Sequence, residues 1–302
     1  MATPYNYIDK NKRETFVVVA IFILVVTFLG WFIGEYFFEG SGTAFVGLAL
    51  IFSGISSFIS YYFCDKIVLG ISGAVEVTYP GAPELHNLVD NMCIASGLPK
   101  PKIYLIEDTA MNAFATGRDP KHATLCFTTG IVNKLEKREL EGVIAHEMSH
   151  IQNYDIRLMT LVSVLVGSIL LLSDWFTRGF FLRGRGRKSS SGSGIVFLIG
   201  IILLLLSPIF AKLLQLALSR SREYMADASA ALMTRYPKGL ADALQKLSMD
   251  TGILEVANRA TASLYIVDPI RHDVINQGFK SGPSLYDTHP PIQERIKRLT
   301  EM

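Results

Sequence analysis

The chain has 302 residues, of which 50% are hydrophobic and 19% are charged, and its formal net charge is +2. An ordinary soluble domain has about a quarter of its residues charged. The composition therefore disfavours an ordinary soluble protein and favours one that lies in lipid, and we expect no nucleic-acid partner.

Four apolar stretches with little interior charge are candidate membrane segments. They are Phe16 to Ile33, Thr43 to Phe63, Leu158 to Ser173, and Ile195 to Leu218, the last with a single Lys212. A helix needs about 20 apolar residues to cross the hydrocarbon core, and about 17 at the least. The first, second and fourth stretches are long enough. The third is slightly short, so the residues leave open whether it spans.

The charges beside the first two stretches predict their orientation. They are Lys10, Lys12 and Arg13 before the first stretch, and Glu35 and Glu39 between the two. Because basic residues collect on the cytoplasmic side, we expect the N-terminus and the polar stretch after residue 65 to face the cytoplasm. The first apolar run is too long for a cleaved signal peptide and should stay as an anchor.

A basic loop joins the third and fourth stretches, and it conflicts with a simple crossing. Its charges are Arg178, Arg183, Arg185, Arg187 and Lys188. If both stretches cross, this loop lies outside, against the tendency of basic residues to stay inside. Otherwise the pair forms a hairpin that dips into the membrane or packs on the protein. In each case the residues before 158 and after 218 lie on the same side.

Residues 66–157 predict a compact soluble lobe. Pro83 begins and Gly97 ends a run that is typical of a helix. Three runs rich in β-branched and aromatic residues follow, KIYLIED, MNAFATG and HATLCFTTG, and they predict a small antiparallel sheet. From Lys134 to Asn153 the apolar residues recur at helical spacing.

That helix carries the sequence His146-Glu147-Met148-Ser149-His150. Histidines four positions apart lie on nearly the same helical face, so both imidazoles can reach one ion, with Glu147 beside it. This is the HExxH arrangement of zinc hydrolases. The alternative is a polar helix face with two solvated histidines. The helix also leads directly into an apolar stretch, which predicts an active site at the membrane surface.

A catalytic zinc needs a third protein ligand and an open position for water. The candidate is Glu223, immediately after the fourth apolar stretch, and Asp227 shares its helical face four residues later. Asp227 can hydrogen-bond the outer nitrogen of a zinc-bound histidine. The alternative is an acid pair at a helix start beside two arginines. The apolar hairpin favours the ligand interpretation, because it returns Glu223 to the side of His146 and His150.

These motifs, in this order, resemble the HtpX-type membrane zinc metalloproteases, relatives of the CAAX prenyl proteases. The shared features are two N-terminal spans, the segment Asn112 to Gly117, the HExxH motif followed by an apolar hairpin, Glu223 with Asp227, and His289-Pro290-Pro291 with Arg295. The resemblance covers most of the chain. It implies a mainly helical α+β multi-pass membrane protein with a gluzincin-like protease core, in which His146, His150 and Glu223 hold one Zn²⁺ per chain.

The chemistry of such a site gives roles to further residues. A bound zinc would acidify its water and polarise the scissile carbonyl, while Glu147 would take the proton of the water and deliver it to the leaving amine. The resemblance implies that His289 and Arg295 lie near the site. We expect them to stabilise the anionic intermediate, unless His289 instead occupies the open zinc position in a latent form. Without the resemblance they would be a turn residue and a solvated helix residue.

The segment MNAFATG is a candidate substrate-binding strand. An edge strand beside a catalytic helix can pair with an extended peptide through its main chain. The small Ala113 and Ala115 would admit close approach, so we expect Asn112, Ala113, Phe114 and Ala115 to bind substrate. An ordinary core strand is the alternative.

The sequence therefore predicts a zinc endopeptidase of the bacterial inner-membrane type, with its active site facing the cytoplasm. The resemblance implies protein substrates, misfolded or damaged membrane proteins in particular, and a role in quality control under stress. The expected parts are a transmembrane hairpin (1–65), a protease lobe (66–157), a second apolar hairpin (158–218) and a C-terminal protease lobe (219–302). The alternatives are a prenyl-protein protease, disfavoured because four segments are too few to enclose an isoprenoid, and a non-catalytic membrane adaptor or transporter.

Overall fold

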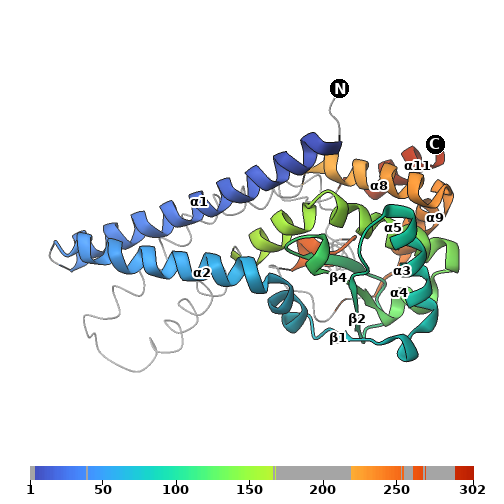
Figure 1. The fold of residues 1–302 in the computed structure, drawn as a ribbon, viewed down its shortest axis with the longest axis horizontal. Helices are drawn as coiled ribbons and strands as arrows, with labels where there is room; N and C mark the ends of the chain where they lie inside the picture. The colour runs from blue at the N-terminus through green and yellow to red at the C-terminus, as the bar shows by residue number, and fades with distance from the viewer. Residues whose placement is uncertain are drawn as a thin grey trace.

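The computed structural model describes residues 4–38, 40–165, 167, 219–252, 254, 261–267, 269 and 290–302. Most of the third and fourth apolar stretches, the basic loop and His289 lie outside the described residues. Within these residues the chain is mainly helical and has one small sheet, which confirms the expected α+β class (Figure 1).

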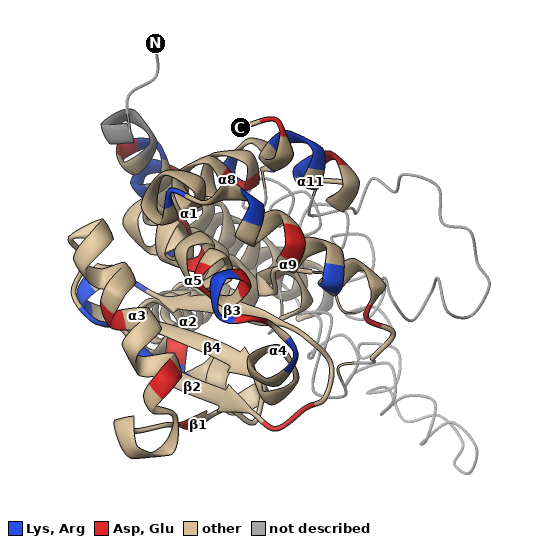
Figure 2. Cartoon of the chain, turned by 90° about the vertical axis from the view of Figure 1, so that its right-hand side faces the viewer, with Lys and Arg blue, Asp and Glu red and all other residues tan. Residues whose placement is uncertain are grey.

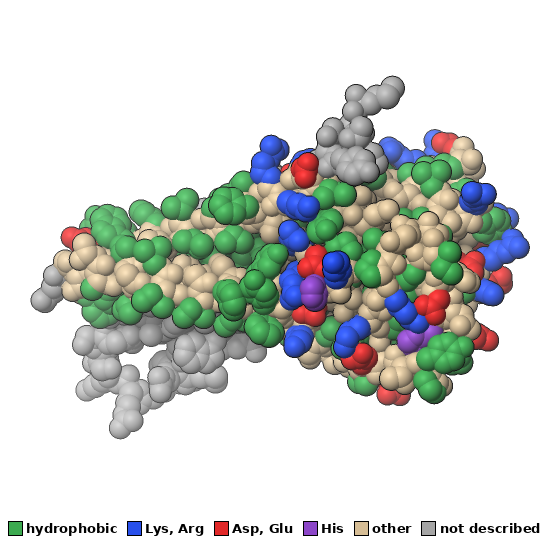
Figure 3. All heavy atoms as spheres, viewed as in Figure 1, with side chains coloured by type: hydrophobic (Ala, Val, Ile, Leu, Met, Phe, Trp, Pro, Cys, Tyr) green, Lys and Arg blue, Asp and Glu red, His purple; other side chains and the backbone are tan. Residues whose placement is uncertain are grey.

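Helices α1 (Pro4–Phe37) and α2 (Gly42–Ile71) form an antiparallel hairpin that projects from the body of the molecule (Figure 1). Each contains an apolar window long enough to cross a membrane, and only 11% of either window is buried. A hydrophobic helix in a soluble core would be mostly buried. Figure 3 shows hydrophobic side chains over the surface of this hairpin. Leu24, Phe28, Leu48 and Ile51 are among the exposed hydrophobic residues of the two helices. Such a surface matches lipid.

Two glycines of α1 allow the two helices to approach closely. A Cβ atom on Gly30 would lie 2.6 Å from the Cβ of Ala49, and one on Gly34 would lie 2.8 Å from the Cβ of Phe45. Side chains do not tolerate such contacts, so glycine is required at these crossings, as is common between membrane helices.

The four strands form one sheet in the order β1-β2-β4-β3. The strands are β1 (Val75–Glu76), β2 (Lys102–Ile106), β3 (Ala113–Gly117) and β4 (Ala123–Thr128). β4 pairs with β2 in parallel and with β3 in antiparallel orientation. The sheet is therefore mixed, and the prediction of a purely antiparallel sheet is wrong in this detail. All six residues of β4 are buried, which suits a central strand covered on both faces, and β3 lies at the edge.

The helices of the first lobe follow their sequence signals closely. α3 (Pro83–Ser96) begins with proline and ends at Gly97, which has a left-handed backbone with φ 71°. The helix predicted over residues 134–153 is α5 (Lys137–Gln152), which begins three residues later than expected, and a short helix α4 (Thr129–Lys134) precedes it. A capping box between Glu136 and Glu139 begins α5 there, because each side chain accepts from an otherwise unpaired backbone N–H of the other residue. Short 3-10 turns lie at Tyr79–Gly81, Pro120–His122 and Ala262–Leu264.

Helix α5 lies at the centre of the protease body. α8 (Arg220–Thr234) and α9 (Pro237–Met249) pack against it, and α11 (Ile292–Thr300) packs on α9. A Cβ on Gly142 of α5 would lie 2.7 Å from the backbone nitrogen of Leu240, so glycine lets α9 approach. Figure 2 shows most charged residues on the helices and few on the strands. This arrangement places the HExxH helix between the sheet and the C-terminal helices.

A second helical run, over residues 155–165, follows α5 after a short break. Tyr154 in this break has a left-handed backbone with φ 60°. The first residues of the third apolar stretch are buried here, with Leu158, Leu161 and Val162 at most 1% exposed. They share a hydrophobic cluster with Phe22 of α1, Val68 of α2 and Phe114 of β3. The hairpin and the protease body therefore have a common core.

Candidate metal centre

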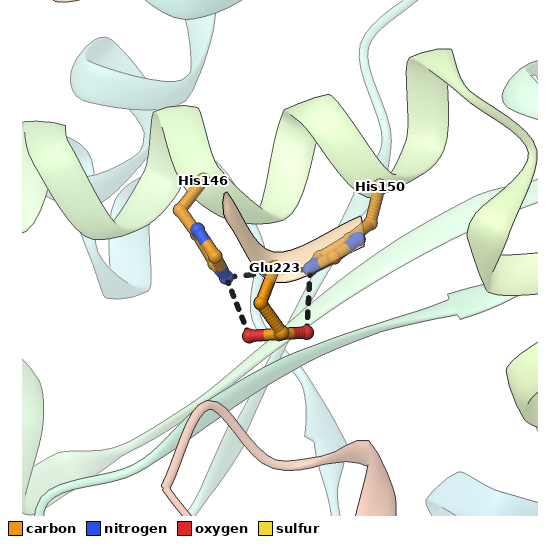
Figure 4. Close-up of side chains that lie close together, drawn as sticks. All are labelled: His146, His150 and Glu223. Atoms are coloured by element: carbon orange, nitrogen blue, oxygen red, sulfur yellow. Dashed lines mark hydrogen bonds and ion pairs between the residues drawn. The ribbon is translucent and has the colours of Figure 1, made fainter. Parts of the chain in front are cut away.

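Two helices bring three potential metal ligands together. His146 and His150 lie one turn apart on α5, and Glu223 lies in the first turn of α8. The Nε2 atoms of His146 and His150 lie 3.7 and 3.6 Å from the two carboxylate oxygens of Glu223. One ligand atom from each residue lies within 4.8 Å of the others. Figure 4 shows both rings turned toward the carboxylate.

The donor set fits a zinc ion. Two imidazole nitrogens and one carboxylate oxygen are the protein ligands of a common type of catalytic zinc site. All three side chains are almost fully buried. The two Nε2 atoms lie only 3.3 Å apart, close enough for one ion to contact both, and without an ion a proton must lie between them. The arrangement is therefore that of a cation site.

His146 is oriented by a carboxylate and a buried arginine. Its Nδ1 lies 3.0 Å from Asp227, which accepts bonds of 2.7 and 2.9 Å from Arg295. An ionised carboxylate can only accept, so Nδ1 carries the proton and Nε2 is left for a metal. Burial would raise the pKa of Asp227, but the charge of Arg295 and the bond with His146 lower this pKa to about 2. Burial would lower the pKa of Arg295, but the charges of Asp227 and Glu223 raise it above its ordinary value.

His150 has an equivalent partner in Asp155. Its Nδ1 lies 2.9 Å from Asp155, which is 1% exposed. Burial alone would lower the pKa of His150, but the hydrogen bond to Asp155 and the charge of Glu223 raise it to about 9. In the absence of a metal both ring nitrogens therefore carry a proton at neutral pH, and a bound metal would replace the proton on Nε2.

Glu147 lies beside the ligands and faces a small cavity. Its side chain is 2% exposed, and its Oε1 has no hydrogen-bond partner among the described residues. Burial raises the pKa of this carboxyl above its ordinary value. The cavity has room for about one water molecule. A buried carboxylate oxygen next to such a space is suited to hold a water.

The cavity walls are otherwise mainly apolar. They comprise Ala115 of β3, Ile156 and Met159 of the 155–165 helix, and Leu264, Tyr265 and Ile266. The segment 264–267 lies along the outer edge of β3, where the N–H of Ile266 donates to the carbonyl of Ala113 at 2.9 Å. The Asn112 side chain donates to the carbonyl of Val267 at 2.8 Å and accepts from its N–H at 3.4 Å. The chain itself therefore covers part of the edge.

The predicted residues are distributed around this centre as follows. His146, Glu147, His150, Glu223, Asp227 and Arg295 come together, Ala115 lines the cavity, and Phe114 packs on Tyr265 with ring centroids 5.0 Å apart. Arg295 contacts Asp227, Glu223 and His146 but is not among the described residues that line the cavity. His289 lies outside the described residues.

Sequence reasoning missed Asp155 and the apolar wall. Asp155 lies five residues after His150, off the helical repeat that singled out Asp227. The sequence indicates Asp155 only by the presence of an acidic residue shortly after the HExxH motif. The wall residues Leu264 to Ile266 lie in a run without helical or strand periodicity, so no pattern indicated that they approach the site.

The fold and site define a class: a gluzincin-type metallopeptidase core joined to a membrane hairpin. Comparison with known proteins agrees with this class. Residues 81–302 match the model of Peptidase family M48. A "Protease HtpX homolog" of Dictyoglomus thermophilum is 42% identical over 99% of this chain and 95% of its own length, and one of Ligilactobacillus salivarius is 40% identical over 99% of both.

A solved structure has a similar fold. The crystal structure of S. mikatae Ste24p has a TM-score of 0.51 and 20% identity, covering 98% of this chain and 67% of that one.

The chain belongs to peptidase family M48. This confirms the resemblance inferred from the motifs, and it identifies the protein as a membrane metalloprotease of the HtpX type that acts on protein substrates.

Proposed function

We propose that the protein is a zinc endopeptidase that cleaves membrane proteins at the cytoplasmic face of a bacterial inner-type membrane. One observation carries the proposal: His146, His150 and Glu223 converge beside Glu147 at the base of a lipid-facing hairpin. Protein substrates follow from the family. Misfolded or damaged membrane proteins, and a role under stress, belong to the proposal.

His146, His150 and Glu223 would hold the ion. A bound zinc would supply Lewis acidity toward a water and a carbonyl oxygen. Oε1 of Glu147 has no hydrogen-bond partner among the described residues, and it would take a proton from the attacking water and return it to the leaving amine. Its raised pKa brings the carboxyl closer to neutrality, which suits a group that both accepts and donates a proton. The apolar walls keep bulk water out.

The contacts of Arg295 support a positioning role. Its guanidinium binds Asp227 and lies 3.2 Å from Glu223. It thereby orients His146 through Asp227 and holds the carboxylate of Glu223. The earlier expectation, that Arg295 and His289 stabilise the anionic intermediate, stays a prediction.

The proposed substrate edge is the outer side of β3 at Ala115. Antiparallel pairing with β4 leaves alternate main-chain groups of β3 pointing away from the sheet. Ala113 uses its outward carbonyl for Ile266, whereas Ala115 lies at the cavity with His146 and Glu147. A peptide in extended form would pair there, with a side chain against the apolar wall.

The orientation of the site supports cytoplasmic substrates. The site lies at the end of α1 that begins the chain, because Asn11 of α1 contacts Asp155 behind His150. This end carries Lys10, Lys12 and Arg13, and basic flanks favour the cytoplasmic side. A protease so placed reaches the cytoplasmic loops and tails of membrane proteins.

The decisive experiment compares the detergent-purified wild type with Glu147→Gln on an unfolded protein substrate, with and without chelator, while bound zinc is measured. We expect the wild type to cut. Glu147→Gln should lower kcat by about 10²- to 10⁴-fold, the usual contribution of a general base, and it should retain its zinc because the amide is isosteric. Loss of zinc in Glu147→Gln would instead make Glu147 part of the metal site. A wild type that binds no zinc in metal-replete medium would refute the enzyme and favour an adaptor.

A further inference from the structure

The two ligand histidines are held in the same way, and one of the two supports includes the membrane anchor. Behind His146 stand Asp227 and the buried Arg295. Behind His150 stand Asp155 and the buried Arg222, which is 4% exposed and lies 3.5 Å from Asp155. Asp155 and Arg222 also contact helix α1.

Asn11 of α1 is the link. Its side chain is 1% exposed, and its Nδ2 donates to Oδ1 of Asp155 at 2.6 Å and to the carbonyl of Asn153 at 2.9 Å. Its Oδ1 accepts from Nε of Arg222 at 3.1 Å. Arg222 also pairs with Glu14, one turn further along α1. Figure 1 shows the start of α8 side by side with the start of α1.

The polarity of this chain of hydrogen bonds has a single solution. Arginine can only donate, so the oxygen of the Asn11 amide must face Arg222 and its nitrogen must face Asp155. Asp155 is thereby held as an acceptor on one oxygen, and its other oxygen accepts from His150 at 2.9 Å. One proton of His150 is consequently fixed on Nδ1. Its Nε2 faces Glu223 and His146, and the proton on that atom is the one that a bound metal replaces.

We propose that Asn11, Asp155 and Arg222 form a positioning element that couples the seating of the membrane helix α1 to the metal affinity of the site. This inference rests on the proposed function in taking His150 and Glu223 as metal ligands. Arg222 precedes Glu223 in the first turn of α8, so the same cluster sets the direction of two ligands. The anchor is then a working part of the metal site as well as an attachment to lipid.

The size of the expected effect follows from other metal sites. Removing a hydrogen-bond partner of a metal-bound histidine lowers metal affinity by about 10- to 100-fold. Asp155→Asn places an NH₂ group either against the amide nitrogen of Asn11 or against Nδ1 of His150. If the NH₂ group faces Nδ1 of His150, Nδ1 must accept and the ring proton lies on Nε2, the atom that would bind the metal. Asn11→Ala leaves Asp155 in place but removes its donor.

The test uses full-length protein in detergent and measures the zinc dissociation constant by chelator competition, with the melting temperature of each metal-free variant. We expect Asp155→Asn and Asn11→Ala to weaken zinc binding about 10- to 100-fold. The exposed Asp9 lies on the same helix, and Asp9→Asn as a matched control should bind zinc like the wild type.

A double exchange separates positioning from mere packing. In Asn11→Asp with Asp155→Asn, the amide at 155 can donate to residue 11 and accept from His150, while residue 11 still accepts from Arg222. The bond to the carbonyl of Asn153 is lost, and the negative charge beside Arg222 moves from residue 155 to residue 11. We expect zinc binding several-fold tighter than in Asp155→Asn alone, even if the melting temperature is not restored.

Three results would overturn the inference: unchanged zinc affinity in both single variants, an equal loss in Asp9→Asn, or a double exchange that binds no better than Asp155→Asn. These outcomes presuppose a wild type that binds zinc. A wild type that binds none refutes the proposed function itself, so the two failures are distinguishable.

Discussion

Arg295 is a charged side chain with only 1% of its surface exposed. It is held because Asp227 and Glu223 both face it, at 2.7 and 3.2 Å. A buried ion pair adds little net stability when complete, because desolvation offsets the attraction. Removing one partner lowers stability strongly, because the remaining charges stay buried without an opposite charge.

Arg295→Met should therefore destabilise the metal-free protein by about 3–5 kcal/mol. The matched control is Arg298→Met, on the same helix, because Arg298 is half exposed and pairs with Glu294 on the surface. Such an exposed pair within a helix contributes little to stability, so Arg298→Met should have a much smaller effect. Denaturant unfolding in detergent measures both variants, and equal effects would show that the buried network has no special role.

At the scale of elements, the hairpin depends on close contact between α1 and α2. Gly30 faces Ala49, whereas a Cβ on Gly47 of α2 would meet no atom of the described residues within 4 Å. The two glycines lie in one hairpin but differ in what surrounds them. They form a natural pair for comparison.

Gly30→Val should force the helices apart and destabilise the protein by about 1–3 kcal/mol, as overpacking does. Gly47→Val adds a side chain that points into open space and should change stability much less. Thermal unfolding of the two variants in the same detergent tests this. A larger loss for Gly47→Val would mean that the contact of α1 with α2 is not what the hairpin requires.

The edge of β3 is the second feature at this scale. Asn112 fastens Val267 by two hydrogen bonds, and this holds Leu264 to Ile266 as a wall of the cavity. The side chain is not among the described residues that line the cavity, so we expect it to act on substrate binding through this neighbouring segment.

Asn112→Ala should raise KM several-fold by loosening that wall, while zinc content and kcat change little. Steady-state cleavage of a peptide together with a zinc assay tests this expectation. If zinc is lost as well, the role of Asn112 is in the structure of the site and the proposed substrate edge loses its support.

At the scale of the whole molecule, the metal site connects parts of the chain that are far apart in sequence. Two of the proposed ligands lie on α5 and the third on α8, and the residues that contact them reach from α1 to α11. An ion bound at this point links the hairpin, the first lobe and the C-terminal lobe. Its removal should therefore loosen the entire protein.

Chelation should lower the melting temperature of the wild type. A ligand at 100 times its dissociation constant stabilises a folded protein by about 2.7 kcal/mol, and this contribution is lost when the ion is withdrawn. Thermal unfolding at increasing chelator concentration measures the effect, and re-addition of zinc should reverse it. An unchanged melting temperature, with zinc shown to have left, would mean that the site is rigid without its ion.

The sequence by itself determined the features that depend on local periodicity. The helical repeat places His146 and His150 on one face whatever surrounds them, and the length of the apolar runs of α1 and α2 indicates lipid. Pro83 and Gly97 indicate where α3 begins and ends, and the spacing of Glu223 and Asp227 places both on one face of α8. These signals were readable because each acts within about one helical turn. The HExxH helix, the hairpin and the motif set were therefore predictable.

Only the tertiary structure decided which distant groups meet. Asn11 and Arg222 are separated by 211 positions, and no periodic pattern connects them with Asp155. The order of the strands was equally hidden, because composition indicates that a strand exists but not which neighbour it pairs with. Both depend on how buried surfaces fit and on which buried polar groups find partners. Such matches are settled when the whole chain packs, and here they join the membrane helix to the metal site.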